Sequence, residues 1–400
     1  MRTMKLIKNL FTLFILACLT FVAYQAWSER SGAKAIEVES VDDLIGAILD
    51  IRAEQTIEVG DIDFGDDTQL NVLLLGLDER KEETELEDAH CDAIHMFTLD
   101  IKYWTIMITS VPRGTGVYIP GGPYAETDYY LANACAFAGL DYGVEQIEQI
   151  IGVKADYVAT VGFSQTYGIL RLLNLPTSES LQWLRHRQSY QIGEPQRVAN
   201  QATFIKDIIV SHISTFESDI TLPLQYVLYS FVDTDMSFAV AHTLLEGFIN
   251  SSIDERPDDI QTQLRPYYPT QELHFDLENY DEQLASIVEY LRPYLSDEDL
   301  SEIPLEQIQT YLVDFIFEQI ELEDDLTDIL DKQLWLQVDS DSQREEVHYS
   351  VIEQYARQAL SDGDQNTAVK IVTDYILEKE LLEIGDWEDR GRELLSEVLK

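Results

Sequence analysis

Apolar residues fall along the middle of the chain in two alternating patterns. Four short, nearly continuous apolar runs are typical of buried strands, and they cover residues 70–75, 93–99, 105–111 and 157–161. The first run ends at Gly76, where we expect a turn. Apolar residues at intervals of three and four predict helices, and they cover residues 141–151, 168–173 and 203–213. Strands that alternate with helices predict a layered α/β domain.

The pattern becomes entirely helical towards the C-terminus. We expect the α/β domain to close with one strand and one helix within residues 273–295. Beyond residue 297, apolar stripes at helical spacing lie within residues 305–316, 347–355 and 368–375. These stripes predict a helical extension that packs on the α/β domain or recruits a protein partner.

An uncharged apolar segment runs from Leu10 to Trp27. At about 1.5 Å per residue it spans roughly 27 Å as a helix, close to the hydrocarbon thickness of a bilayer. Basic residues precede it and acidic sequence follows, which orients the N-terminus inward and the bulk of the chain outward. The alternatives are a cleaved signal peptide and a lipoprotein signal ending at Cys18. The apolar run continues past Cys18, so we favour an uncleaved single-pass anchor in the plasma membrane.

Composition divides the chain into four parts. The segment after the anchor is acidic and carries one amphipathic patch, which Ser40 is placed to cap as a short helix. We interpret this segment as a spacer. The four predicted parts are residues 1–30 (cytoplasmic tip and anchor), 31–67 (spacer), 68–296 (α/β domain) and 297–400 (acidic helical extension).

Acidic residues strongly outnumber basic ones. The chain has 74 Asp and Glu residues against 27 Lys and Arg, for a formal net charge of −47. Such a surface repels a nucleic-acid backbone, so we expect no nucleic-acid partner. The hydrophobic fraction of 45% is large enough for a sizeable core.

Two cysteines, Cys91 and Cys135, lie outside the apolar N-terminal segment. Two residues make no disulfide framework. Outside the cytoplasm they permit one bridge, whereas two small buried thiols are the alternative. The sequence leaves both open.

Charged residues gather where the predicted strands begin and end. Asp78 follows the first strand, Asp92 precedes the second and Arg113 ends the third. Further arginines of this part of the chain are Arg80, Arg185, Arg187 and Arg197. Arginine binds phosphate through two parallel hydrogen bonds, and two aspartates beside it suit a Mg²⁺ ion that bridges pyrophosphate oxygens. Surface ion pairs with the abundant carboxylates are the alternative interpretation.

Six segments, taken in order, resemble the LytR-CpsA-Psr family. They are residues 71–80, Asp92-Ala-Ile, Ser110-Val-Pro-Arg113, Leu131-Ala-Asn-Ala134, residues 157–163, and Arg185-His-Arg187 with Arg197 and Gln201. The resemblance covers roughly residues 68–215 and extends more loosely to about residue 295.

The resemblance implies an anchored extracytoplasmic enzyme with a three-layer α/β/α core, a mixed sheet and an apolar tunnel for a polyprenyl tail. Members of the family transfer glycopolymers such as teichoic acids from polyprenyl pyrophosphate to peptidoglycan. By position, Asp78 and Asp92 would hold Mg²⁺, and Asp92 and Arg113 would be catalytic. The residues expected to bind the pyrophosphate are Arg80, Arg113, Arg185, Arg187, Arg197 and Gln201.

Three positions lack a charged residue of the family pattern, and a hydroxyl of that pattern is also lost within residues 90–93. Gly114 stands where an aspartate usually follows Pro-Arg, His90 where an arginine is usual, and Asn200 where a second arginine often precedes the glutamine. These changes remove charge from the expected pocket. The alternative function is therefore a polyprenyl-phosphate-binding envelope protein with weak or no activity, which recruits partners through its helical C-terminus.

A transition-metal site is another interpretation of the same region. Asp88, His90 and Asp92 are two residues apart, and Cys91 and His95 lie nearby. Strand periodicity would bring the first three to one face. The sequence holds no matching second cluster, so we prefer the Mg²⁺ site.

Overall fold

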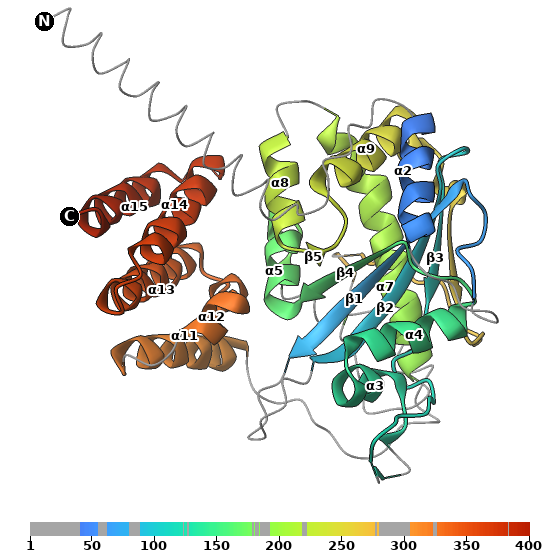
Figure 1. Ribbon diagram of the computed structural model, residues 1–400, viewed down its shortest axis with the longest axis horizontal. Helices are drawn as coiled ribbons and strands as arrows, with labels where there is room; N and C mark the ends of the chain where they lie inside the picture. Colours follow the sequence, from blue (N-terminus) through green and yellow to red (C-terminus); the bar gives the residue numbers. More distant parts are fainter. Residues whose placement is uncertain are drawn as a thin grey trace, which may run out of the picture.

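The computed structural model contains a six-stranded mixed sheet and a C-terminal group of helices (Figure 1). It describes residues 41–54, 62–79, 89–122, 124–125, 128–177, 180, 184, 193–217, 222–276, 278–279, 305–322, 326–382 and 384–400. The predicted N-terminal anchor lies outside these ranges. Within them, no helix is both long and apolar enough to cross a bilayer.

The sheet has the strand order β5-β4-β1-β2-β3-β6. Its strands are β1 (Gln69–Glu79), β2 (Ala89–Asp100), β3 (Thr105–Ser110), β4 (Tyr157–Gly162), β5 (Asp233–Thr234) and β6 (Ile260–Leu264). β2 pairs antiparallel with β1 and β3, whereas β4 is parallel to β1 and β6 is parallel to β3. The predicted α/β core is confirmed, and its sheet is mixed. The four apolar runs all form strands.

The described part of the sheet has an edge strand, β6, that the sequence does not predict. The closing strand and helix expected within residues 273–295 lie mostly outside the described residues, and those that are described, 273–276, 278 and 279, form no strand. In β6, Ile260 and Leu264 are buried, but the three residues between them are polar. An edge strand of this kind lacks the continuous apolar run that identifies a central strand.

Seven described helices belong to the α/β part of the chain. They are α2 (Val41–Glu54), α3 (Leu131–Ala138), α4 (Leu140–Ile151), α5 (Phe163–Leu172), α7 (Gly193–His212), α8 (Leu222–Ser230) and α9 (Phe238–Asn250). The C-terminal helices are α11 (Leu305–Glu321), α12 (Thr327–Asp331), α13 (Asp341–Ser361), α14 (Gln365–Leu381) and α15 (Gly385–Val398). Short 3₁₀ turns cover Ile213–Phe216, Ile253–Glu255, Pro257–Asp259 and Leu334–Gln337. The predicted helical C-terminal region is confirmed.

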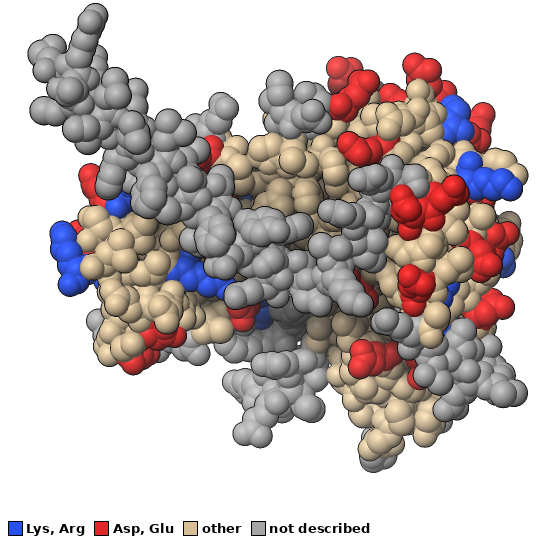
Figure 2. Space-filling view, turned by 45° about the horizontal axis from the view of Figure 1, so that its top comes forward, with Lys and Arg blue, Asp and Glu red and all other residues tan. Residues whose placement is uncertain are grey.

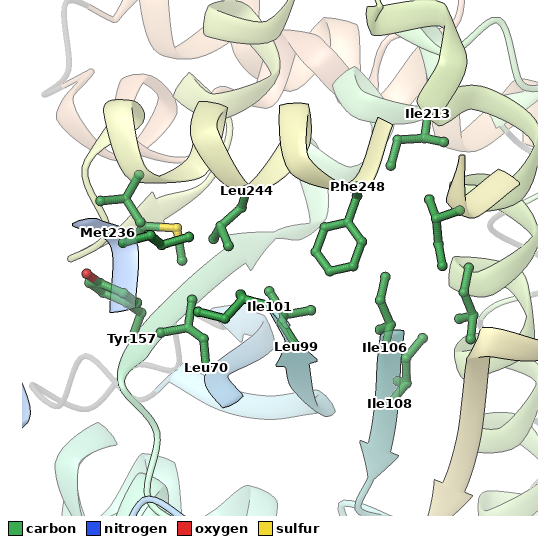
Figure 3. Close-up of a cluster of buried hydrophobic side chains, with 14 of the residues drawn as sticks. Leu70, Leu99, Ile101, Ile106, Ile108, Tyr157, Ile213, Met236, Leu244 and Phe248 are labelled. Carbon is green, nitrogen blue, oxygen red and sulfur yellow. The ribbon is translucent and has the colours of Figure 1, made fainter. Parts of the chain in front are cut away.

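Helices pack on both faces of the sheet because its central strands are apolar on both sides. In β1, Leu70 and Val72 join one core cluster, whereas Leu73 and Leu75 join another. The first cluster lies under α2, α7 and α9, and the second under α3 and α4. Figure 3 shows Leu244 and Phe248 of α9 pointing onto the strands in the first cluster. Each such side chain contributes about 2–3 kcal/mol by burial.

Helix α2 lies within the predicted spacer, yet its apolar face joins the core of the sheet. Leu44 and Ile48 are almost fully buried in the first cluster. Arg52 donates to both carboxylate oxygens of Asp156, at 2.7 and 3.0 Å, and to the carbonyl oxygen of Gln69 at 2.6 Å. Part of the spacer therefore packs with the domain, while the predicted boundaries of the four parts stay a prediction.

The first strand, predicted to end in a turn at Gly76, continues to Glu79. Gly76 lies opposite a β-bulge in β2. Gly76 pairs with Ala93 and the next residue, Leu77, pairs with Cys91, so Asp92 is the extra residue of β2. A Cβ atom on residue 76 would lie 2.9 Å from the Cβ of Ala93. Only glycine fits there without a shift of the strands.

A disulfide bridge joins β2 to α3. Cys91 and Cys135 are bonded, with Cα atoms 6.0 Å apart and a sequence separation of 44 residues. Both are buried in the second core cluster. Gly143 of α4 lies directly against the bridge, since a Cβ there would be 2.4 Å from the sulfur of Cys135. Of the two alternatives that the sequence leaves open, the structure has the bridge.

The C-terminal helices pack against the edge of the α/β part that carries α5 and α8 (Figure 1). Arg171 of α5 donates to the carbonyl oxygens of Leu336 and Val338, at 3.0 and 3.2 Å. Val227 and Phe231 share a core cluster with residues of α11, α12 and α13. Core contacts therefore continue from the sheet region into the helical extension.

Removal of the disulfide should destabilise the protein, because the bridge closes a long loop in the unfolded chain. For Cys91→Ala combined with Cys135→Ala we expect the free energy of unfolding to fall by about 2–4 kcal/mol in urea denaturation. A reductant should lower the midpoint of the wild-type protein and leave the double variant unchanged. A wild-type midpoint that does not respond to reductant would contradict the bridge.

Candidate active site

The predicted site residues come together at one end of the sheet. The carboxyl ends of β1, β3, β4 and β6 point to the same edge, where β2 begins. Ligand sites of open α/β sheets lie at such an edge. Asp78 in β1 pairs with His90 in β2, two residues before Asp92. The two aspartates predicted to hold Mg²⁺ thus lie on adjacent strands, close in the ladder.

Asp92 and Arg113 form the centre of the site. An Arg113 guanidinium nitrogen donates to the Asp92 carboxylate, and the two side chains are 23% and 20% exposed. Arg113 lies three residues after the end of β3, whereas Asp92 lies at the bulge of β2. A bulge bends its strand and changes the direction of a side chain, and such bulges are common beside active sites.

Helix α7 adds two more charges. Arg197 donates to the carboxylate of Glu194 at 2.5 Å and to the backbone carbonyl oxygen of Asp92 at 3.2 Å. The same Glu194 oxygen lies 3.8 Å from Nε of Arg113. Two carboxylates and two guanidinium groups therefore form one connected network. Glu194 is in the first turn of α7, where the helix dipole stabilises negative charge.

Arg197 has capacity for a further ligand. Its side chain is 4% exposed, and its Nε has no hydrogen-bond partner among the described residues. A buried donor without a partner costs about 1–3 kcal/mol. An oxygen atom of a bound phosphate would remove that cost.

His95 extends the network beneath the site. Its Nδ1 lies 2.7 Å from the hydroxyl of Ser110, across the β2–β3 ladder. Burial, together with the charge of Arg197, lowers the pKa of His95 to about 4, and a hydrogen bond with Gln201 opposes this shift. Gln201 also donates to the carbonyl oxygen of Leu184 at 3.0 Å. His95 is therefore neutral above about pH 4 and adds no charge to the site.

The structure brings together four of the predicted site residues with described side chains: Asp92, Arg113, Arg197 and Gln201. Asp78 is placed by its backbone in β1. Arg80, Arg185 and Arg187 lie outside the described residues. The roles assigned to these residues stay predictions.

The sequence-based selection missed Glu194, His95 as a neutral partner, and Ser110. Glu194 is three residues before Arg197, a spacing that brings two side chains together on a helix. That spacing was a usable signal. His95 and Ser110 become neighbours only through the pairing of β2 with β3, which local sequence does not specify.

The donor set at the site fits a hard cation. Asp92 offers carboxylate oxygens, the ligands that Mg²⁺ prefers, and Asp78 lies on the adjacent strand. Mg²⁺ is commonly bound by one or two carboxylates together with substrate phosphates. Among the described residues, no three His, Cys, Asp or Glu side chains are grouped as a complete metal site. A cation here would complete its shell with substrate and water.

The transition-metal interpretation does not hold for the described residues. Cys91 is bonded to Cys135. The bulge at Asp92 breaks the two-residue alternation that the interpretation requires of β2. His95 is buried against Ser110.

Residues 47–167 match the model of the LytR_cpsA_psr family. The chain is also 33% identical over 125 residues to the polyisoprenyl-teichoic acid–peptidoglycan teichoic acid transferase TagT of Bacillus subtilis (strain 168). That match covers 31% of this chain and 37% of TagT, so it spans little more than a third of the relative.

The solved structures that are similar to this chain include the following two. The crystal structure of B. subtilis TagV has 18% identity and a TM-score of 0.40, and the match covers 57% of this chain and 99% of that chain. A structure of TagT bound to LIIa-WTA has 18% identity and a TM-score of 0.34, with coverage of 60% and 94% respectively.

The lowered pKa of His95 predicts a pH-dependent stability. Between about pH 4 and 6.5 the unfolded chain binds a proton that folded His95 does not, so stability is lost as pH falls through this window. The loss reaches about 3 kcal/mol at pH 4, and it is absent above about pH 6.5. In urea denaturation, the free energy of unfolding of His95→Gln should fall by about 3 kcal/mol less than that of the wild-type protein between about pH 6.5 and 4.

The exposed His274 provides the control, since its side chain is 57% exposed. His274→Gln should change stability by less than about 1 kcal/mol across the same range. Equal pH dependence of the wild-type protein and His95→Gln would show that His95 is not held neutral by burial.

Proposed function

Residues 47–167 of this chain are a LytR-CpsA-Psr family domain, and from that premise we propose that the protein is a glycopolymer–peptidoglycan phosphotransferase of cell-wall assembly. The donor is a glycopolymer on polyprenyl pyrophosphate and the acceptor is peptidoglycan. The partial match to TagT, named as a teichoic acid transferase, supports this chemistry.

The observation that carries the proposal is the charge network at the carboxyl edge of the sheet. Arg113 and Arg197 are linked through Glu194, and both contact Asp92. Two guanidinium groups held by neighbouring carboxylates are pre-positioned for the oxygens of a pyrophosphate. Figure 2 shows Asp and Glu spread over the visible surface, with Lys and Arg in smaller groups. Against this acidic background, a pair of adjacent arginines is a selective anion site.

The reaction follows from positioning and charge neutralisation. A hydroxyl oxygen of the acceptor attacks the phosphorus next to the donor sugar. The bond from that phosphorus to the bridging oxygen breaks, and polyprenyl phosphate leaves. Arg113 and Arg197 balance the charge on the phosphate oxygens, while Asp92 orients the hydroxyl and takes its proton. Most of the rate enhancement in such a transfer comes from orientation and electrostatics.

Mg²⁺ bound by Asp78 and Asp92 would neutralise further negative charge on the pyrophosphate. Glu194 would keep Arg113 and Arg197 together beside the pyrophosphate oxygens. The remaining cationic contacts of the proposal are Arg80, Arg185 and Arg187.

The same proposal includes the place of the protein in the cell. A single-pass anchor at residues 10–27 holds the chain in the plasma membrane, with its bulk outside the cytoplasm. The Cys91–Cys135 bridge supports this orientation, because disulfides persist in oxidising compartments.

A second function is favoured by Gly114 and Asn200, which lack the charge of the family pattern. Asn200 is 2% exposed and accepts a hydrogen bond from Gln196 at 2.8 Å, so it serves the packing of α7. A protein that binds polyprenyl phosphate without transferring glycopolymer fits these residues. Polyprenyl phosphate that co-purifies with a protein showing no turnover would support this alternative.

Loss of the Asp92 charge should abolish transfer. We expect Asp92→Asn to lower the Mg²⁺-dependent release of polyprenyl phosphate by about 100-fold or more, measured by mass spectrometry on the full-length protein in detergent. Asp100→Asn is the matched control, since Asp100 caps the turn at the opposite end of β2, and it should retain full activity. Equal turnover of Asp92→Asn and wild type would remove Asp92 from the site.

Restoring the missing carboxylate should raise activity. A Cβ atom on residue 114 meets nothing within 4 Å, so Gly114→Asp fits without a clash. The added carboxylate would lie next to Arg113 and should increase the transfer rate by up to about tenfold, or about 1.4 kcal/mol in the barrier. An unchanged rate would indicate that Glu194 already supplies the carboxylate that Arg113 requires.

A further inference from the structure

A series of aromatic rings leads from the candidate site to the protein surface. It begins beside His90, which pairs with Asp78 and lies two residues before Asp92. The ring of His90 is edge-on to Phe137 of α3, with centroids 6.3 Å apart. Phe137 in turn stacks on Tyr124, with centroids 5.0 Å apart and planes inclined by 19°.

The series continues into the loop between β3 and α3. Tyr124 meets Tyr129 edge-on at 6.0 Å, and Tyr129 stacks on Tyr118 at 6.3 Å. Tyr118 is 70% exposed and Phe137 is 37% exposed. We call Phe137, Tyr124, Tyr129 and Tyr118 the ring series. It places exposed aromatic faces on a path that begins at His90, two residues before Asp92 in β2.

Specific contacts hold the ring series in place. The hydroxyl of Tyr142 donates to the carbonyl oxygen of Tyr118 at 2.7 Å. A Cβ atom on Gly122 would lie 2.6 Å from the ring of Tyr124, so glycine lets this ring fold over the backbone. Gly116 forms a bridge with Tyr130 that ties the two ends of the loop. The loop is therefore built to present rings and is more than a connection.

Two acidic side chains, Asp128 and Glu145, lie beside the ring series. Asp128 accepts a hydrogen bond from the backbone of Ala125 at 3.1 Å. Burial and then the charge of Glu145 raise the pKa of Tyr142, which contacts Tyr118. An anionic polymer would be repelled here, whereas an uncharged sugar chain would not.

We propose that the ring series binds the uncharged glycan strand of the acceptor and delivers its hydroxyl to Asp92. The C–H faces of pyranose rings pack on aromatic faces, whose electron density attracts them. The assignment rests on the proposed function for the identity of the acceptor. It differs from that function in naming the surface that recognises the sugar chain.

The first test is direct binding of an uncharged β-linked tetrasaccharide, N-acetylchitotetraose, to the full-length protein by calorimetry. Tyr118→Ala should weaken binding by about tenfold, and Tyr118→Phe, which keeps the ring, should bind like wild type. Tyr103→Ala is the matched control, because Tyr103 is 63% exposed at the opposite end of the sheet. It should leave binding unchanged.

Absence of binding to the wild-type protein, or equal binding by Tyr118→Ala, would overturn the assignment. Equal binding of a poly(glycerol phosphate) chain would overturn the choice of an uncharged glycan.

The second test separates the acceptor from the donor. Tyr118→Ala should raise KM for peptidoglycan about tenfold, while the release of polyprenyl phosphate to water stays unchanged. Loss of both activities together would assign the ring to the donor and contradict the proposal. Tetrasaccharide binding without any transfer would leave the ring series supported and the phosphotransferase function refuted, so the two failures are distinguishable.

Discussion

The arrangement of the site depends on one irregularity in the pairing of β1 with β2. Asp92 is an extra residue in β2, and Gly76 is the residue of β1 that tolerates it. With the bulge, Cys91 and Ile94 both reach the core under α3 and α4, although they are three residues apart. The same bulge leaves Asp92 next to Arg113. The disulfide and the candidate site are therefore two consequences of one local feature.

Charge balance is the second constraint. In a chain with a net charge of −47, each arginine at the site has carboxylates available to it. Glu194 links Arg113 to Arg197. Together with Asp92, these residues form a network of two positive and two negative groups. A phosphate ligand must therefore compete with these carboxylates for the two guanidinium groups. A divalent cation on Asp92 would favour the phosphate in that competition. His95 beneath the site is neutral, so it neither repels the arginines nor pairs with the carboxylates.

Sequence patterns predicted the parts of the fold that depend on local periodicity. The four central strands and the C-terminal helices follow from apolar runs and stripes, and Asp92 and Arg113 follow from their positions at strand ends. The polar edge strand β6 and the bulge at Gly76 could not be read in this way, because each depends on the neighbouring strand. The spacing of Glu194 from Arg197 indicates an ion pair within one helix, but its link to Arg113 depends on the packing of α7 beside the end of β3.

The central claim is that phosphorus, and not a sugar carbon, is attacked at this site. The most direct test uses a donor labelled with ³²P in the phosphate next to the sugar, together with peptidoglycan and Mg²⁺. Phosphoryl transfer carries that phosphate to the acceptor, so the account predicts label in the insoluble peptidoglycan fraction and unlabelled polyprenyl phosphate. Label that remains on the lipid as pyrophosphate while sugar appears on the peptidoglycan would mean attack at carbon, and it would contradict the account.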